Sequence, residues 1–215
     1  MQVKSFPVGA FGTNCYIVWD EATKQGVVID PGYDVYRIQM TLAANKVECK
    51  YILLTHGHVD HVTGAQELKE KTGALTVIGV KDAHYLTGEQ DPEFRVYYAI
   101  NYPNTPPDVT VKEGDKLEVG GLTFRVMETP GHTPGGVCYL CGDYLFCGDT
   151  LFQGSCGRTD LEGGSWPEIL RSLARLSRLP GEMFVLSGHG PTTTIERERE
   201  YNPFVRDALE AEKQE

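Results

Sequence analysis

A short run of histidines and one aspartate, residues 55–61 (THGHVDH), carries the side chains of this sequence best suited to metal chemistry. The run directly follows an apolar stretch that reads as a buried strand. In an extended segment His56 and His58 point to the same side, so both can reach one ion. Asp60 and His61 follow where the chain turns into a helix. Neutral imidazole nitrogen and carboxylate oxygen are ligands expected of zinc, iron or manganese.

Three further residues of the same chemical types stand in glycine-flanked turns: His132 in PGHTPGG, Asp149 in CGDT and His189 in SGHGP. Glycine lets the backbone turn sharply beside an ion. Five of the six histidines lie in these motifs, and the sixth, His84, is interpreted as a surface or helix-capping residue. Because isolated surface histidines do not gather at strand ends and turns in this way, the set predicts a metal centre built from several loops.

Short runs, apolar in the first half of the chain and alternating between residues 116 and 147, predict the strands that bring these loops together. They cover residues 16–19, 27–29, 51–54, 75–80, 116–119, 122–127, 137–141, 144–147 and 183–186. Helices are expected after Asp34, at about 62–71, after the capping box that begins at Ser165, and after Thr193 with an interruption near Pro203. This order predicts an α/β (α+β) fold in which two packed sheets carry helices on their outer faces. A doubly wound parallel sheet is the alternative, but its glycine-rich phosphate fingerprint is absent.

The length of 215 residues suits one domain spanning residues 1–215. A segment at about 88–107, rich in proline and tyrosine, is expected to be a surface insertion. With 20 Lys and Arg against 30 Asp and Glu, the net charge of −10 leaves no broad basic face for nucleic acid.

The sequence shows no sign of membrane insertion or export. No apolar run approaches the ~18 residues of a transmembrane helix, and the first residues lack the pattern of a secretory signal. The six cysteines are therefore expected to be reduced thiols of a cytoplasmic protein. Cys138 and Cys141 form a C-x-x-C, but on a strand an offset of three places them on opposite faces, which disfavours a redox or zinc pair.

The order H-x-H-x-D-H, followed by His, Asp and His, resembles the pattern of the metallo-β-lactamase superfamily. The segments CGDTLFQGSCGRTDLEGG and SGHGPTTTIEREREYNPF resemble those of its short, single-domain glyoxalase II-like hydrolases. The resemblance implies a four-layer αββα sandwich with two divalent metal ions at one edge of the sheets. The implied ligands are His56, His58 and His132 for the first ion, Asp60, His61 and His189 for the second, and Asp149 between the two, with a bridging hydroxide.

The same resemblance implies a hydrolase that uses this hydroxide to cleave a small thioester, such as S-lactoylglutathione or a related 2-hydroxyacyl thioester. Asp60 and Asp149 are the expected catalytic residues. The expected cofactors are two divalent ions, zinc first, with iron or manganese as alternatives. The expected partner is a small-molecule substrate, bound by a monomer or small homo-oligomer. Long glyoxalase II proteins carry a further helical domain for glutathione, which is not expected here, so the thiol carrier stays open.

Sister branches of the superfamily differ at individual positions. Flavodiiron proteins tend to carry glutamate where His58 stands, and many zinc β-lactamases carry cysteine where Asp149 stands, so neither branch is favoured. Persulfide dioxygenases share the GRTD element, here residues 157–160, and use a single iron. That activity is the first alternative, and a metal-stabilised binding module without turnover is the second.

Two residues outside the ligand set have competing interpretations. Arg158 fits a clamp for a substrate carboxylate, because a guanidinium forms bidentate pairs, and it equally fits an ion pair with Asp160 or Glu162. Asp30, which ends the apolar run VVID, is either an acceptor that orients a ligand histidine or the first residue of an Asx-turn. The sequence leaves both pairs of interpretations open.

Overall fold

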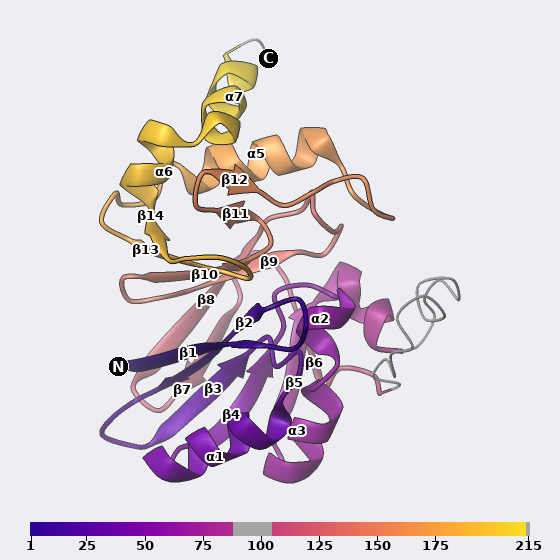
Figure 1. Ribbon diagram of the computed structural model, residues 1–215, viewed down its shortest axis with the longest axis vertical. Coiled ribbons are helices and arrows are strands. Elements are labelled where there is room, and N and C mark those ends of the chain that lie inside the picture. The colour runs from indigo at the N-terminus through magenta and orange to yellow at the C-terminus, as the bar shows by residue number, and fades with distance from the viewer. Residues whose placement is uncertain (88–104, 214–215) are drawn as a thin grey trace.

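The structure, a computed structural model, describes residues 1–87 and 105–213 (Figure 1). The first half comprises β1 (Gln2–Val8), β2 (Thr13–Trp19), β3 (Gln25–Ile29), α1 (Val35–Asn45), β4 (Glu48–Leu53), α2 (Val59–Val62), α3 (Ala65–Thr72), β5 (Leu75–Gly79), the 3-10 helix η1 (Val80–Leu86) and β6 (Val109–Val111). The second half comprises β7 (Lys116–Val119), β8 (Leu122–Glu128), β9 (Val137–Cys141), β10 (Tyr144–Gly148), β11 (Leu151–Phe152), β12 (Ser155–Cys156), α5 (Trp166–Leu176), β13 (Phe184–Ser187), β14 (Thr193–Thr194), α6 (Ile195–Tyr201) and α7 (Pro203–Glu212).

The strands of the described residues form two six-stranded sheets and one small hairpin. The first sheet has the order β1-β2-β3-β4-β5-β6, the second has the order β14-β13-β10-β9-β8-β7, and β11 pairs with β12. Strands β3 to β6 run parallel, as do β10 and β13. Parallel neighbours end at the same edge of a sheet, so the loops that follow them meet there.

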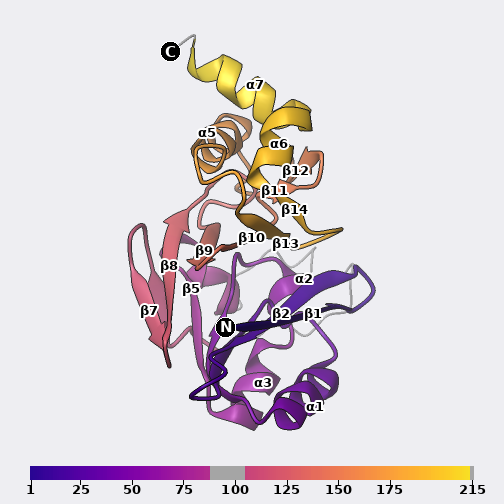
Figure 2. The ribbon, with the colours of Figure 1, turned by 90° about the vertical axis from the view of Figure 1, so that its left-hand side faces the viewer.

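Each sheet is buried on both faces, which gives four layers (Figure 2). In β2, Ile17 packs with residues of α1 and α3, whereas Tyr16 and Val18 point into the core between the two sheets. On the far side of the second sheet, Ile169 and Leu173 of α5 pack against residues of β10 and β13. The predicted αββα sandwich is confirmed. Burial on both faces also explains why central strands such as β2, β3 and β9 are apolar nearly throughout, whereas β7 and β8, at one edge of the second sheet, alternate between buried and exposed residues.

Local predictions from the sequence hold for the longer elements and fail for the shortest. All the predicted strands and helices form, with ends shifted by a few residues, and the C-terminal helix divides at Pro203. The sequence did not predict β6, β11, β12, β14 and α2, which are two to four residues long, nor the longer β1 and η1, in which polar residues interrupt the apolar ones. The predicted insertion at 88–107 falls largely on residues 88–104, outside the described residues.

Two predicted helix caps are wrong in detail. Ser165 precedes α5, but its side chain makes no capping hydrogen bond. Asp34 precedes α1 in the left-handed conformation, with φ of 57°, and its carboxylate accepts from the amide of Gly9 instead. Thr194 does cap α6, where its hydroxyl accepts from the amide of Arg197. Among residues 1–87 and 105–213, no helix is long and apolar enough to cross a membrane.

Candidate metal centre

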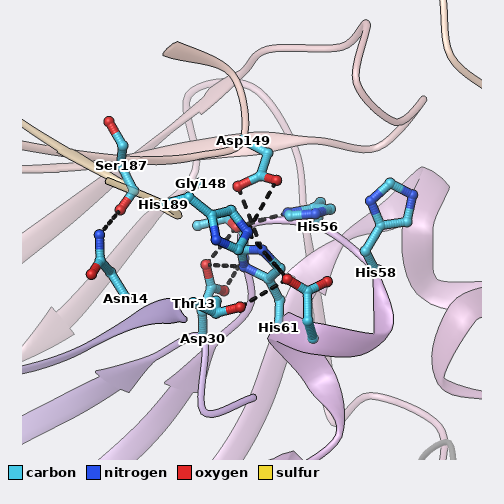
Figure 3. A network of polar contacts seen from close by, with 12 residues as sticks. Thr13, Asn14, Asp30, His56, His58, His61, Gly148, Asp149, Ser187 and His189 are labelled. Atoms are coloured by element: carbon cyan, nitrogen blue, oxygen red, sulfur yellow. Dashed lines mark hydrogen bonds and ion pairs between the residues drawn. The ribbon is translucent and has the colours of Figure 1, made fainter. Parts of the chain in front are cut away.

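Four loops, each following the end of a strand, deliver the predicted ligands to one place. The loop after β4 carries His56, His58, Asp60 and His61, the last two within α2. The loops after β8, β10 and β13 carry His132, Asp149 and His189, respectively. Figure 3 shows the rings of His56, His61 and His189 beside the Asp149 carboxylate. Both sheets therefore contribute, the first through β4 and the second through the other three strands.

The seven side chains form three overlapping groups whose donor atoms lie within 4.8 Å of one another. The groups are His56, His58 and His132; His56, His61 and Asp149; and Asp60, His61 and His189. The structure thus brings together every residue of the predicted ligand set in a His/Asp cluster that can hold metal. The division of these residues between a first and a second ion stays a prediction.

Hydrogen bonds on the outer side of two rings fix their tautomers. Nδ1 of His61 lies 2.9 Å from Oδ2 of Asp30 and donates to it, because a carboxylate only accepts. The Thr55 hydroxyl donates to the same Asp30 oxygen at 2.7 Å, so it accepts from Nδ1 of His56 at 3.1 Å. In both rings Nε2 is left with its lone pair facing the cluster. The first interpretation of Asp30, as an acceptor that orients a histidine, is thereby confirmed.

The ring of His132 is fixed in the same way from the second sheet. Its Nδ1 lies 2.7 Å from the backbone carbonyl of Arg158 and donates to that oxygen. Nε2 of His132 then faces Nδ1 of His58, at 2.8 Å. The roles of these two nitrogens follow the His58 tautomer: Nδ1 of His58 either donates to Nε2 of His132 or leaves both lone pairs for a cation.

Three buried atoms of the cluster have no hydrogen-bond partner among the described residues: Nε2 of His56, Nε2 of His61 and Oδ1 of Asp149. A buried polar atom left unsatisfied costs about 1–3 kcal/mol. All three are electron-pair donors aimed at the same small volume, and a divalent cation would satisfy them together. The residues present therefore fit one or two metal ions with nitrogen and oxygen ligands.

The electrostatics of the cluster favour positive charge at its centre. Burial alone would lower the pKa of His61, but the carboxylates of Asp60, Asp149 and Asp30 outweigh burial and raise that pKa to about 10. Burial opposes ionisation of Asp60 too, yet His61 and His189 keep the pKa of Asp60 well below its usual range. Without metal, the carboxylates thus draw a second proton onto Nε2 of His61; a metal cation would take the place of that proton and use the lone pair of Nε2.

The pKa values of the other two histidines in the first loop move the opposite way. Burial, followed by the neighbouring imidazoles, lowers the pKa of His56 and lowers that of His58 to about 3. Both rings are therefore neutral at pH 7, the protonation state in which an imidazole binds metal.

Close backbone approaches explain two glycines at the centre. A Cβ on Gly188 would lie 2.1 Å from Oδ1 of Asp149, and a Cβ on Gly157 would lie 1.8 Å from the Asp149 carbonyl oxygen. Any other residue at either position would displace this carboxylate or its backbone. These glycines allow Asp149 to sit between the two halves of the cluster.

Three residues that hold the ligand loops have no distinctive pattern in the sequence. Thr13 donates its hydroxyl to Oδ2 of Asp60 at 2.8 Å. Asn14 donates its amide to the carbonyls of Ser187 and Gly190, which flank His189, at 3.0 and 2.9 Å (Figure 3). Asp82 accepts hydrogen bonds from the loop after β4 and from the loop after β8. In the sequence, Thr13 and Asn14 are a polar pair immediately before an apolar run. Such pairs are too common to indicate a role for either residue.

Arg158 lies beside the cluster but its guanidinium points to Asp160. The two side chains form a bidentate ion pair, with contacts of 2.7 and 2.6 Å. The ion-pair interpretation is thus present in the structure, and the role of Arg158 as a substrate clamp stays a prediction. His84 is exposed and stacks on Tyr85, as expected of a residue outside the ligand set.

The cysteines take no part in the cluster. Cys138 belongs to the core under α5, and Cys141 belongs to the core between the sheets, so the C-x-x-C pair does face opposite ways. All six cysteines are free thiols.

Comparison with known proteins agrees with this geometry. A sequence model described as the metallo-beta-lactamase superfamily matches residues 8–189. The chain belongs to this superfamily. Hydroxyacylglutathione hydrolase GloC of Haemophilus influenzae is 34% identical over 210 residues, covering 95% of this chain and 98% of GloC. Members of the superfamily are metallo-hydrolases, and the short single-domain glyoxalase II-like resemblance is supported by this relative.

Three solved structures share the fold closely. The BLEG-1 B3 metallo-beta-lactamase has a TM-score of 0.88 at 35% identity, covering 95% of this chain and 99% of that one. TTHA1623 in a di-iron-bound form has a TM-score of 0.83 at 34% identity, covering 94% and 99%. ETHE1 from Myxococcus xanthus has a TM-score of 0.82 at 31% identity, covering 98% and 91%. Proteins with different names thus share this architecture, and one of them is described in a di-iron-bound form.

Proposed function

We propose that this protein is a metal-dependent hydrolase that cleaves small thioesters, with S-lactoylglutathione or a related 2-hydroxyacyl thioester as substrate. The observation that carries the proposal is the convergence of seven nitrogen and oxygen donors, with three buried donor atoms left for a cation. The similarity to GloC supports the choice of substrate class.

The proposed ligands are those of the two outer groups, with Asp149 between them. His56, His58 and His132 would hold a first ion, and Asp60, His61 and His189 a second. Oδ1 of Asp149 lies 3.4 Å from Nε2 of His61, and its Oδ2 lies 3.6 Å from Nε2 of both His132 and His189. Asp149 therefore faces both halves, which suits a residue that holds two ions at a fixed separation.

When bound, divalent ions supply hydroxide at neutral pH and polarise a carbonyl, because they lower the pKa of water from ~15.7 toward ~7. The chain positions the reactants. Asp60, held by Thr13, is aimed into the cluster and would accept a hydrogen bond from the attacking hydroxide. Addition to the acyl carbon is followed by cleavage of the C–S bond. The thiolate leaves without strong acid assistance, and the acid product carries away the added oxygen.

The first experiment measures hydrolysis of S-lactoylglutathione by protein whose zinc, iron and manganese contents have been quantified. We expect turnover that a chelator abolishes and that falls by at least about 100-fold in His58→Ala and Asp149→Ala. His84→Ala, which removes an exposed histidine outside the cluster, is the matched control and should leave turnover unchanged. Normal thioester hydrolysis by an Asp149→Ala protein that retains two ions would overturn the assignment.

A mononuclear iron persulfide dioxygenase is the second candidate, favoured by the similarity to ETHE1 and by Gly157-Arg158-Thr159-Asp160. Iron content and oxygen uptake with glutathione persulfide distinguish it from a hydrolase. A β-lactam is included as a third substrate because of the similarity to BLEG-1. If the metallated protein turns over only the persulfide or only the β-lactam, the thioesterase proposal is wrong. Full metal occupancy without any turnover would indicate a binding module.

A further inference from the structure

A buried carboxylate outside the ligand set, that of Asp82 in η1, joins the two loops that supply the three-histidine group. Its Oδ2 accepts from the amide of Gly57 at 3.0 Å and from the hydroxyl of Thr133 at 2.7 Å. Its Oδ1 accepts from the amide of Gly135 at 2.6 Å. The side chain is completely buried. All three donors belong to loops that carry predicted ligands.

The position of these donors makes Asp82 a bridge between the two sheets. Gly57 lies between His56 and His58, in the loop after β4 of the first sheet. Thr133 follows His132, in the loop after β8 of the second sheet. The distance between the two sides of the three-histidine group therefore depends on contacts that cross from one sheet to the other. Asp82, which follows β5 of the first sheet, makes two such contacts, to Thr133 and Gly135, and its third hydrogen bond ties the same carboxylate to Gly57.

The Asp82 carboxylate has enough acceptor positions for all three of these hydrogen bonds. Burial raises the pKa of Asp82, although its three hydrogen-bond donors act against the rise. No Lys or Arg within residues 1–87 and 105–213 forms an ion pair with it. Burial of a carboxylate without a counter-ion costs free energy, and several hydrogen bonds to its two oxygens offset that cost. An amide or hydroxyl side chain would offer fewer acceptors, so it would leave at least one donor unsatisfied.

The other half of the cluster has two anchors of its own and one that it shares. Thr13 holds Asp60 and Asn14 holds the loop of His189, whereas Asp30 holds His61 and also, through the Thr55 hydroxyl, His56. None of these contacts involves Asp82. A substitution of Asp82 should therefore change the metal affinities of the two halves of the cluster by different amounts.

We propose that Asp82 is a positioning residue that sets the separation of the His56–His58 loop from the His132 loop, and so governs the affinity of the three-histidine group for its ion but not that of the Asp60–His61–His189 group. The proposal rests on the two-ion assignment made above. It does not depend on which substrate the protein turns over.

The test compares metal affinities in nearly isosteric variants by zinc titration against a chromophoric chelator. Asp82→Asn replaces one acceptor oxygen with an amide, and Thr133→Val removes one of the three donors, while Thr133→Ser keeps it. We expect the affinity for one ion to fall about 10–100-fold in Asp82→Asn, and less in Thr133→Val, with the affinity for the other ion within about 3-fold of wild type. Thr133→Ser should behave as wild type.

A second anchor identifies which ion is affected. Thr13→Val removes the hydrogen bond to Asp60 and should weaken the other ion alone. The double variant Asp82→Asn/Thr13→Val should then have a lower affinity for both ions. If both residues acted on the same ion, the affinity for the other ion would stay at the wild-type value. The cobalt-substituted proteins give an independent check, because Asp82→Asn and Thr13→Val should alter different components of the visible absorption spectrum.

Three results would overturn the proposal. They are equal weakening of both ions in Asp82→Asn, loss of unfolding stability with both affinities unchanged, and identical behaviour of Thr133→Val and Thr133→Ser. If Asp82→Asn does not fold, the Thr133 pair decides the question alone. Failure of the proposed function looks different: the wild-type protein would bind two ions and still not hydrolyse a thioester, and the affinity comparison would remain valid.

Discussion

The Asp30 carboxylate accepts a hydrogen bond from Nδ1 of His61 at 2.9 Å, on the side of the ring that faces away from the metal centre. Both side chains are fully buried. On its other side, the ring presents Nε2 to Asp60 and Asp149, each at 3.4 Å. Asp30 thus decides which nitrogen of His61 carries the proton and which is free to bind a cation.

Asp30→Asn tests this relationship. The amide keeps the shape of the side chain but removes one acceptor, and we expect the affinity for the ion at His61 to fall about 10–100-fold. Metal content after dialysis against a weak chelator measures the loss. Asp143→Asn, a change of the same kind at an exposed hairpin turn, should retain its metal. Equal metal content in the two variants would contradict the role assigned to Asp30.

Gly157→Ala should distort the centre through the backbone. The new Cβ would lie 1.8 Å from the carbonyl oxygen of Asp149 and 3.1 Å from Cβ of His132. Overpacking of this kind costs about 1–3 kcal/mol, so we expect a lower free energy of unfolding in urea and reduced metal content. Gly121→Ala is the control, because its Cβ would meet nothing closer than 3.4 Å. A Gly157→Ala protein as stable and as well metallated as this control would refute the prediction.

Arg158→Ala tests the proposed substrate clamp. If the guanidinium binds a substrate carboxylate, KM should rise about 10-fold with little change in kcat, because ground-state and transition-state binding are lost together. Arg158→Lys keeps the charge but not the bidentate geometry and should recover only part of the loss. A thioester whose thiol and acyl parts both lack carboxylates should be unaffected. An unchanged KM in Arg158→Ala would leave only the ion pair with Asp160.

Removing metal should weaken the fold. Without a cation, three buried donor atoms lose their partner. Chelation should lower the free energy of unfolding by about 2.7 kcal/mol if the free ion had been at 100 times its Kd. Thermal unfolding with excess zinc and with chelator measures the change. His58→Ala should show a smaller difference between the two conditions than His84→Ala, and identical shifts in both variants would argue against an ion at this cluster.

The cysteines should resist alkylation in the folded protein. Burial raises the pKa of Cys138 and Cys49 to about 12, of Cys141 and Cys156 to about 11, and of Cys15 and Cys147 well above the usual value. At pH 8 under about 1% of each thiol is then ionised, and the thiolate is the reactive form. Iodoacetamide followed by intact mass measurement should show slow labelling of Cys156 at most, and six labels after unfolding. Fast native labelling of several thiols would disagree with these pKa values.

The residue types and spacing of the sequence determined the ligand set and the class of fold. Imidazole and carboxylate at His56, His58, Asp60 and His61 leave little chemistry other than metal binding, and this can be inferred without coordinates. The central strands were equally evident, because burial on both faces makes them apolar nearly throughout. The order of the elements predicted two packed sheets with helices on their outer faces, the resemblance named the αββα sandwich, and the structure confirmed it.

Tertiary structure alone decided what holds those ligands in place. Thr13 and Asp60 are far apart in the sequence, as are Asp82 and Thr133, and each pair meets only because loops from different strands converge at one edge of the two sheets. Single threonines and aspartates are common in loops, so local patterns do not distinguish an anchor from a solvated side chain. Hydrogen bonds depend on the position of both partners to within tenths of an ångström, and only the packed sheets fix those positions.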